Sequence, residues 1–256
     1  MKKQRWVIKA GSNLLIQGGP LLIRDLMLQV ETLKKKHKIE VIWVTSGAIG
    51  TARKRLGIQK KKKSSLSEKQ ALSAIGQPMV MDLYNLALQS CGLKGAQVLI
   101  TYSDLANKNQ LKNFQNTLET LLHWDVVPVL NENDAVATEE IRFGDNDSLS
   151  AKIAIALKAD RLVILTDVDG VYDSDPSKNP SAKLISEIPK VTDQVLEMGG
   201  KSKSEYGTGG MLSKLLAAQE ASHNQITTFL VKGDHASVLL KIAKNEKVGT
   251  LVRSKK

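Results

Sequence analysis

Short apolar runs and longer stretches of helical periodicity alternate along this chain. The apolar runs, rich in Val, Ile and Leu, predict buried strands at residues 7–10, 41–45, 98–101, 126–130, 162–166, 226–231 and 249–253. Apolar residues at helical spacing predict helices at residues 20–37, 48–56, 68–91, 111–123, 148–158, 192–197, 211–223 and 236–243. Strands that alternate with helices are typical of an α/β protein whose mainly parallel sheet is covered on both faces.

Glycine, proline and polar residues mark the breaks between these elements. Gly76 and Pro78 are expected to interrupt the helix at residues 68–91. Residues 57–67, 171–186 and 199–210 are predicted loops, and residues 136–143 an extended or hairpin segment. No internal repeat and no linker-like change of composition divides the chain, so we expect a single domain.

Polar side chains gather immediately after the predicted strand at residues 126–130. They are Asn131, Asn133, Asp134, Asn146 and Asp147. Ligands bind at the carboxyl ends of strands in open α/β sheets, so a site is expected here. Amides and carboxylates together suit a small zwitterion, because they pair with ammonium groups and polar hydrogens. A polar loop with Asx turns is the alternative.

Three segments suggest phosphate binding, although the chain has neither a GxxxxGK[ST] loop nor a GxGxxG fingerprint. Lys9 is followed by a glycine–serine turn at a strand end, and three glycines precede Lys214 at the start of a predicted helix. Backbone N–H groups and an ammonium at such places can hold a polyphosphate. Thr166 and Asp167 end another predicted strand and are candidates for contacts with a nucleotide. An ordinary surface lysine in a flexible connector is the alternative for Lys214.

Composition narrows the class of protein. The net charge of +11 raises the possibility of nucleic acid binding, but the lysine runs at residues 34–36 and 60–63 lack interleaved aromatic residues. We therefore expect no nucleic acid partner. The single cysteine, Cys91, points to a reducing compartment, and no apolar run is long enough for a signal peptide or a membrane span. We predict a cytoplasmic protein without a membrane partner.

Six motifs, taken together, resemble the glutamate 5-kinases, a branch of the amino acid kinase superfamily. They are VIKAGSN from Val7, VTSGAIG from Val44, NENDAVAT from Asn131, FGDNDSLSA from Phe143, LTDVDGVYDSDP from Leu165 and GTGGMLSK from Gly207. They span almost the whole chain in the same order as in that family. The pairing of NENDAV with GDND is the feature specific to this branch.

The resemblance implies a three-layer α/β/α sandwich with a mainly parallel central sheet. It also implies ATP-dependent phosphorylation of the γ-carboxylate of L-glutamate with Mg²⁺, the first step of proline biosynthesis. We expect one kinase domain over residues 1–256, with residues 1–150 on the amino-acid side and 151–256 on the nucleotide side. Many relatives carry a C-terminal PUA domain, and we expect none here because the sequence ends at Lys256.

The same resemblance implies roles for individual residues. Lys9, Lys214 and Asp147 match the catalytic group, in which the acid holds both lysines in place. Ser46, Asp134 and Asn146 match the glutamate site. The nucleotide contacts are Lys9, Gly11, Thr166, Asp167, Thr208, Gly209, Gly210, Met211 and Lys214. No protein ligand is assigned to Mg²⁺, which the ATP phosphates would carry, and a contact between Asp147 and the metal stays open.

Partners and alternatives follow from the resemblance as well. L-Glutamate and ATP are the expected substrates, proline is a candidate feedback inhibitor, and a homo-oligomer, either a dimer or a tetramer, is expected. One alternative is another member of the superfamily that phosphorylates a different carboxylate, carbamate or phosphate. A second alternative is a basic RNA-associated protein that has kept the fold.

Overall fold

The computed structural model describes residues 3–59, 64–136, 146–200 and 210–255. The described strands are β1 (Arg5–Ala10), β2 (Glu40–Val44), β3 (Gly95–Ile100), β4 (Val127–Glu132), β5 (Arg161–Thr166), β6 (Glu187–Ile188), β7 (Thr227–Lys232) and β8 (Thr250–Val252). The described helices are α1 (Ser12–His37), α2 (Ala48–Leu56), α3 (Leu66–Ser90), α4 (Tyr102–Ala106), α5 (Lys108–His123), α6 (Asn146–Ala156), α7 (Asp193–Met198), α8 (Met211–His223) and α9 (Val238–Ala243).

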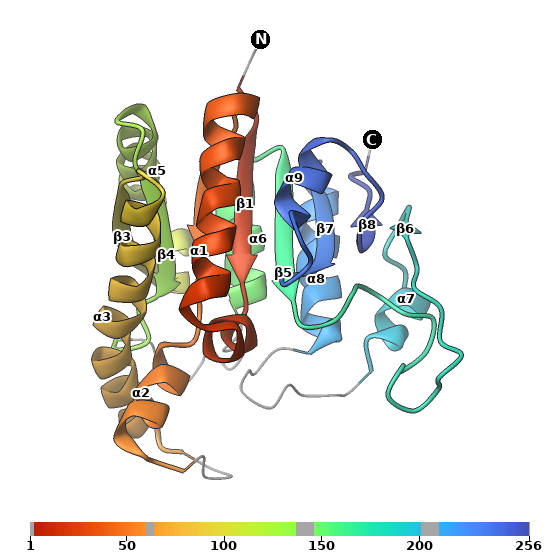
Figure 1. Ribbon diagram of the computed structural model, residues 1–256, viewed down its shortest axis with the longest axis horizontal. Coiled ribbons are helices and arrows are strands. Elements are labelled where there is room, and N and C mark those ends of the chain that lie inside the picture. Colours follow the sequence, from red (N-terminus) through yellow and green to blue (C-terminus); the bar gives the residue numbers. More distant parts are fainter. Residues whose placement is uncertain (1–2, 60–63, 137–145, 201–209, 256) are drawn as a thin grey trace.

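The strands form one sheet in the order β3-β4-β2-β1-β5-β7-β8-β6 (Figure 1). Every pairing is parallel except the antiparallel pairing of β7 with β8. The predicted mainly parallel sheet is therefore confirmed. β1 has β2 on one side and β5 on the other. The strands β2 to β4 are added on one side of β1 and the strands β5 to β8 on the other, so the strand order reverses next to β1. Ligand sites of open α/β sheets lie at such a point.

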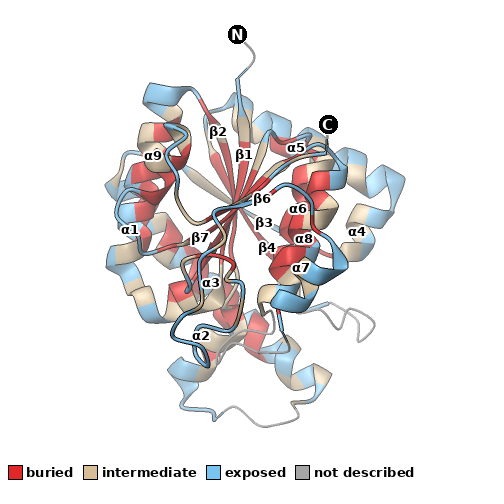
Figure 2. Cartoon of the chain, turned by 90° about the vertical axis from the view of Figure 1, so that its right-hand side faces the viewer, coloured by how far each residue is buried: buried red, intermediate tan, exposed pale blue. Residues whose placement is uncertain are grey.

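Two hydrophobic cores lie on opposite faces of the sheet, because successive strand residues point to opposite sides. In β1, Trp6 and Ile8 belong to the core shared with α1, α3 and α9, whereas Val7 belongs to the core shared with α5, α6 and α8. Figure 2 shows the buried strands between these two helical layers. The arrangement is the expected α/β/α sandwich.

Several element boundaries differ from the sequence-based prediction. The first helix begins at Ser12 rather than at residue 20, and Gly19, with φ of 64°, interrupts its helical backbone just before Pro20. The short helix α4 was not predicted, although a capping box between Thr101 and Asp104 starts it. The strand β6 was not predicted either. It is only two residues long, within a region rich in Asp, Pro and Ser.

The predicted interruption of helix α3 is wrong. The helix continues through Gly76 and Pro78. A Cβ atom at Gly76 would lie 1.9 Å from the main-chain oxygen of Ala48, the first residue of α2. This glycine therefore allows two helices to touch and does not end one. The predicted features at residues 60–63, and most of those at 136–143 and 199–210, lie outside the described residues.

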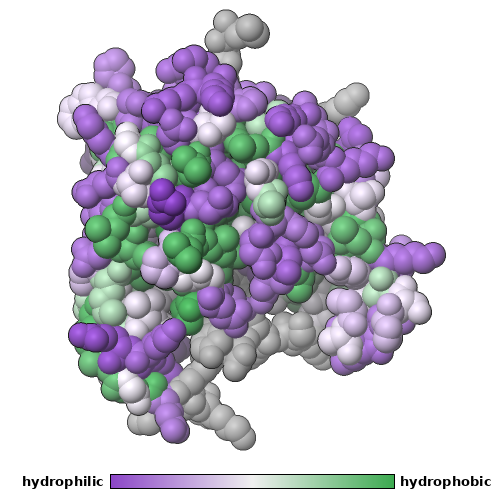
Figure 3. All heavy atoms as spheres, in the orientation of Figure 1, coloured by the Kyte–Doolittle hydropathy of each residue, from purple (hydrophilic) through white to green (hydrophobic). Residues whose placement is uncertain are grey.

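The face of the molecule that carries α1 and α3 is largely hydrophilic, with separate apolar patches between the polar side chains (Figure 3). Leu21 and Leu28 of α1 are the two most exposed large apolar residues of that helix.

None of the helices in the described part of the chain is both long and apolar enough to cross a membrane.

Candidate active site

The candidate site lies where the carboxyl ends of β1, β2, β4 and β5 meet the amino ends of α1, α6 and α8. The strands are parallel, so their final residues share one edge of the sheet. The positive ends of three helix dipoles face the same region, which favours a negatively charged ligand. Sequence segments far apart along the chain meet here.

A buried carboxylate joins the two predicted phosphate-binding lysines. Asp147, in the first turn of α6, is fully buried, with Oδ1 2.6 Å from Nζ of Lys9 and Oδ2 3.1 Å from Nζ of Lys214. Lys9 comes from the end of β1 and is only 4% exposed, and Lys214 lies in the first turn of α8 and is 8% exposed. Ser213 also donates to Oδ2 of Asp147 at 2.9 Å.

The electrostatics of this group favour an anion. Burial by itself would raise the pKa of Asp147, but the charge of Lys9 and then that of Lys214 outweigh it, and the pKa lies well below its ordinary value. The carboxylate is therefore ionised at neutral pH, and the two ammonium groups beside it leave one excess positive charge. A buried excess charge is costly unless a partner compensates it, and a phosphate oxygen is such a partner.

Both helices that follow the predicted phosphate-binding segments begin after glycine. Gly11 precedes α1 and Gly210 precedes α8, and neither helix has a side-chain cap or an acidic residue in its first turn. A Cβ atom at Gly11 would lie 3.7 Å from Nζ of Lys9, so the glycine keeps the backbone open beside that ammonium. Met211 is the first residue of α8. Thr208 and Gly209 lie outside the described residues.

The end of β5 lies beside the start of α1. Thr166 is buried and donates to Oδ1 of Asp167 at 3.1 Å, and Asn13 donates to Oδ2 of the exposed Asp167 at 2.7 Å. Desolvation would raise the pKa of Asp167, but the hydrogen bond from Asn13 is the largest of several contributions that lower it. Asp167 is thus an exposed anion held in one orientation, which suits hydrogen bonding to the hydroxyl groups of a ligand.

Two of the three predicted acceptor-site residues lie beside the lysine group. Ser46 donates to the main-chain oxygen of Ala10 at 3.2 Å and accepts from the hydroxyl of Ser12 at 3.1 Å. Asn146 directly precedes Asp147, and its Nδ2 donates to the main-chain oxygen of Thr45 and to Oδ1 of Asn131 at 2.6 Å.

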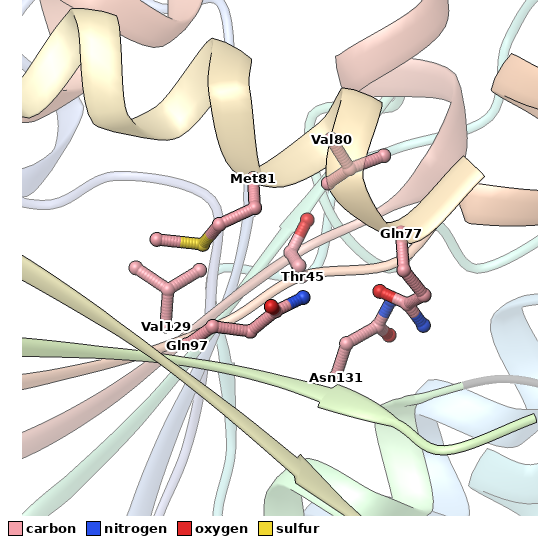
Figure 4. A pocket seen from close by; sticks show the side chains of 7 residues that line it. All are labelled: Thr45, Gln77, Val80, Met81, Gln97, Val129 and Asn131. Atoms are coloured by element: carbon pink, nitrogen blue, oxygen red, sulfur yellow. The ribbon is translucent and has the colours of Figure 1, made fainter. Parts of the chain in front are cut away.

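The third residue, Asp134, lies in the turn after β4 and accepts a hydrogen bond from Ser73 of α3 at 3.1 Å. Burial raises the pKa of this carboxyl. A small pocket, of about 10 Å³, lies between α3 and the strands β2, β3 and β4 (Figure 4). This volume holds one water molecule at most, so the pocket is a gap behind the predicted acceptor side and is too small for an amino acid. The lining residues are Thr45, Gln77, Val80, Met81, Gln97, Val129 and Asn131.

Sequence reasoning did not identify several polar residues of this region. Asn13, Ser213 and Gln77 each bond to a predicted site residue or to its neighbour. Asn13 and Ser213 lie inside the motifs VIKAGSN and GTGGMLSK, which was an available signal. Gln77 lies in the middle of a helix outside those motifs, where the sequence offers no comparable signal.

Comparisons with known proteins identify the family of the chain. Residues 4–232 match the model of the amino acid kinase family. The glutamate 5-kinase of Geobacter sulfurreducens is 42% identical over 254 residues, which are 98% of this chain and 68% of that protein. The glutamate 5-kinase of Meiothermus ruber is 43% identical over 251 residues, which are 97% of this chain and 66% of that protein. The UMP kinase of Bacillus anthracis has a similar structure, with a TM-score of 0.65 over 100% of this chain and 98% of that one, at 17% identity. The chain therefore belongs to the amino acid kinase family, in the branch of the glutamate 5-kinases.

Proposed function

We propose that this protein transfers the γ-phosphoryl group of ATP to the γ-carboxylate of L-glutamate. The product would be L-glutamyl 5-phosphate, and the reaction would be the first step of proline biosynthesis. The observation that carries this proposal is the buried Lys9–Asp147–Lys214 group at a meeting point of three helix amino ends. The glutamate 5-kinases that match almost the whole chain support the choice of acceptor.

The chemistry needs little proton transfer. A glutamate side chain has an ordinary pKa of about 4.3, so the nucleophile is already ionised at neutral pH. The barrier comes instead from bringing an anion against a polyanion and from the charge that develops on the transferring group and on ADP. Fixed positive charges and precise placement lower such a barrier. Lys9 and Lys214 supply the charges, and Asp147 holds both ammonium groups in place.

The residues present fit a magnesium ion that is carried mainly by the nucleotide. Both oxygens of Asp147 are engaged by ammonium groups, and no cluster of three or more His, Cys, Asp or Glu side chains occurs among the residues that the structure describes. Mg²⁺ bound through substrate phosphates needs no such cluster. When bound, the ion would neutralise charge on the β- and γ-phosphates.

We assign the remaining predicted residues to two sides of the site. Ser46, Asp134 and Asn146 would select the amino acid, with Asp134 as partner of its ammonium group. Gly11, Gly210 and Met211 lie at helix starts, where backbone N–H groups suit phosphate oxygens.

Thr166 and Asp167 would contact the nucleotide, and Thr208 and Gly209 stay predicted nucleotide contacts. In this assignment, residues 1–150 carry most of the amino-acid side and residues 151–256 most of the nucleotide side.

Regulation and assembly complete the proposal. Proline has the carbon skeleton of a cyclised glutamate, so it would compete for the acceptor site and inhibit the reaction. We further propose that the protein acts in the cytoplasm as a dimer or tetramer. Inhibition by proline is tested by its effect on KM for glutamate, and assembly by light scattering coupled to size-exclusion chromatography.

The decisive experiment measures ADP release from ATP and Mg²⁺ with L-glutamate, L-aspartate, N-acetylglutamate or UMP as the acceptor. Hydroxylamine is added to trap an acyl phosphate as its hydroxamate. Hydroxamate with L-glutamate alone is the expected result. Turnover with another acceptor would reassign Ser46, Asp134 and Asn146. No turnover with any acceptor, together with salt-sensitive retention of RNA, would favour the RNA-associated alternative.

A further inference from the structure

A continuous row of buried amide side chains connects helix α3 with the acceptor side of the site. Nδ2 of Asn146 donates to Oδ1 of Asn131 at 2.6 Å, and Nδ2 of Asn131 donates to Oε1 of Gln77 at 2.9 Å. All three residues are at most 6% exposed. Figure 4 shows Gln77 reaching down from α3 toward Asn131 on β4.

Main-chain groups determine the orientation of each amide in this row. Nε2 of Gln77 donates to the main-chain oxygen of Glu132 at 3.0 Å, so its Oε1 must face Asn131. The main-chain N–H of Glu132 donates to Oδ1 of Asn131 at 3.0 Å, and Nδ2 of Asn146 donates to the main-chain oxygen of Thr45. A main-chain oxygen only accepts and a main-chain N–H only donates, so reversing any amide would place two donors or two acceptors together.

The consequence appears at the end of the row, beside the lysine group. A primary amide has two N–H bonds, and both of those on Asn146 are directed to protein oxygens. Asn146 can therefore meet a ligand only through Oδ1, as a hydrogen-bond acceptor. An acceptor in this position matches the ammonium group of an amino acid and repels a carboxylate.

The same segment of α3 also contacts Asp134, another predicted acceptor-site residue. Ser73, one helical turn before Gln77, donates to Oδ2 of Asp134 at 3.1 Å, and the Nε2 of Gln77 lies 3.5 Å from its hydroxyl. One face of α3 thus bonds to both polar segments of the acceptor side. Ser73 and Gln77 are both buried, so neither is placed to contact solvent.

We propose that Gln77 is a positioning residue that sets the polarity of the acceptor site for an amino acid with a free ammonium group. It acts through Asn131 on Asn146, and it touches neither substrate nor the reacting atoms. This inference rests on the proposed function, because it assumes that Asn146 faces the acceptor. It adds a residue of α3 that the sequence motifs do not include.

The first test replaces Gln77 with Met, which has a similar length but no amide. We expect KM for L-glutamate to rise by about tenfold, the effect of losing one oriented hydrogen bond, while kcat and KM for ATP change by less than about threefold. Gln89→Met is the matched control, since Gln89 is an exposed residue of the same helix. Equal changes in KM for both substrates would overturn the proposal.

A double-mutant cycle separates positioning from a general effect on folding. If Gln77 acts through Asn146, the Gln77→Met change has almost no further effect on KM for glutamate in a protein that already carries Asn146→Ala. If the two changes multiply independently, the proposal is wrong. Thermal unfolding of all variants is measured alongside.

Gln77→Glu provides a second test that stands if the Met variant does not fold. The introduced carboxyl can donate to the main-chain oxygen of Glu132 only when it is protonated. Burial beside that oxygen raises its pKa. We compare KM for glutamate in Gln77→Glu with KM for glutamate in the unaltered protein. The ratio of the first constant to the second should fall as the pH is lowered from about 8 to about 6. A ratio that does not depend on pH would contradict the proposed orientation.

Failure of the proposed function would look different, because the unaltered protein would not phosphorylate L-glutamate. Binding of L-glutamate to the unaltered protein and to the variants, followed as a shift of the thermal unfolding midpoint, then tests Gln77 without turnover. A smaller shift in Gln77→Met than in Gln89→Met, at the same concentration of L-glutamate, is expected. An equal shift in both variants would overturn the inference.

Discussion

Replacing Asp147 with Asn gives the sharpest test of the lysine group. The change keeps the size of the side chain but removes the negative charge that contacts Lys9 at 2.6 Å and Lys214 at 3.1 Å. Two nearly buried ammonium groups would then repel each other without compensation. Removing one partner of a buried ion pair costs about 3–5 kcal/mol. In a chain of this length, that cost lowers the midpoint of thermal unfolding by roughly 6–20 °C.

The pH dependence of this effect follows from the depressed pKa of Asp147. A carboxyl group with a lower pKa in the folded state stabilises the protein above its unfolded-state pKa, which is about 3.9 for Asp. That stabilisation is lost as the pH falls from there toward the folded-state pKa. The difference in free energy of unfolding between the unaltered protein and Asp147→Asn should therefore be full at neutral pH and shrink below about pH 4.

Urea unfolding followed by circular dichroism at several pH values measures this difference. Turnover is measured at neutral pH and should fall by at least about a hundredfold, because both lysines lose their fixed positions. Asp82→Asn, at an exposed residue of α3, is the control. The midpoint of thermal unfolding is measured as well. A thermal midpoint within about 1 °C of that of the unaltered protein, together with near-normal kcat, would refute the argument.

Three further predictions follow from the same structure. Lys9→Ala or Lys214→Ala should lower kcat by at least about a hundredfold, the usual loss for a transition-state donor, and near-normal turnover in a steady-state assay would exclude that role. Asp134→Ala should raise KM for L-glutamate far more than KM for ATP, and equal changes in the two constants would remove it from the acceptor site. Gly76→Ala should destabilise the protein by about 1–3 kcal/mol in chemical denaturation, because its Cβ would overlap a main-chain oxygen of α2. Gly18→Ala is a comparison for that change, since the three heavy atoms nearest to its Cβ all belong to the side chain of Leu22 and none to a main chain.

Local patterns predicted most of the fold. Apolar runs located seven of the eight described strands, and helix α8 was predicted at its observed bounds, Met211–His223. The errors arose where one local signal has two meanings. Pro20 indicated a helix start, but it follows a kink at Gly19 inside a longer helix. Gly76 indicated a break, but it permits close packing between two helices, and packing depends on a segment distant in sequence.

The sequence by itself singled out Lys9, Asp147 and Lys214 as the predicted catalytic residues, because they lie within recognisable motifs. The family resemblance implied that Asp147 holds both lysines, but local patterns alone do not place it there. The contact exists only in the tertiary structure, because the ends of β1, α6 and α8 must meet to form it. Gln77 lies beyond sequence reasoning altogether. Two of its bonds are to the side chain of Asn131 and to the main-chain oxygen of Glu132. A main-chain oxygen is the same in every residue, so no pattern of side chains in the sequence encodes that bond, and only the packing of α3 against the end of β4 creates it.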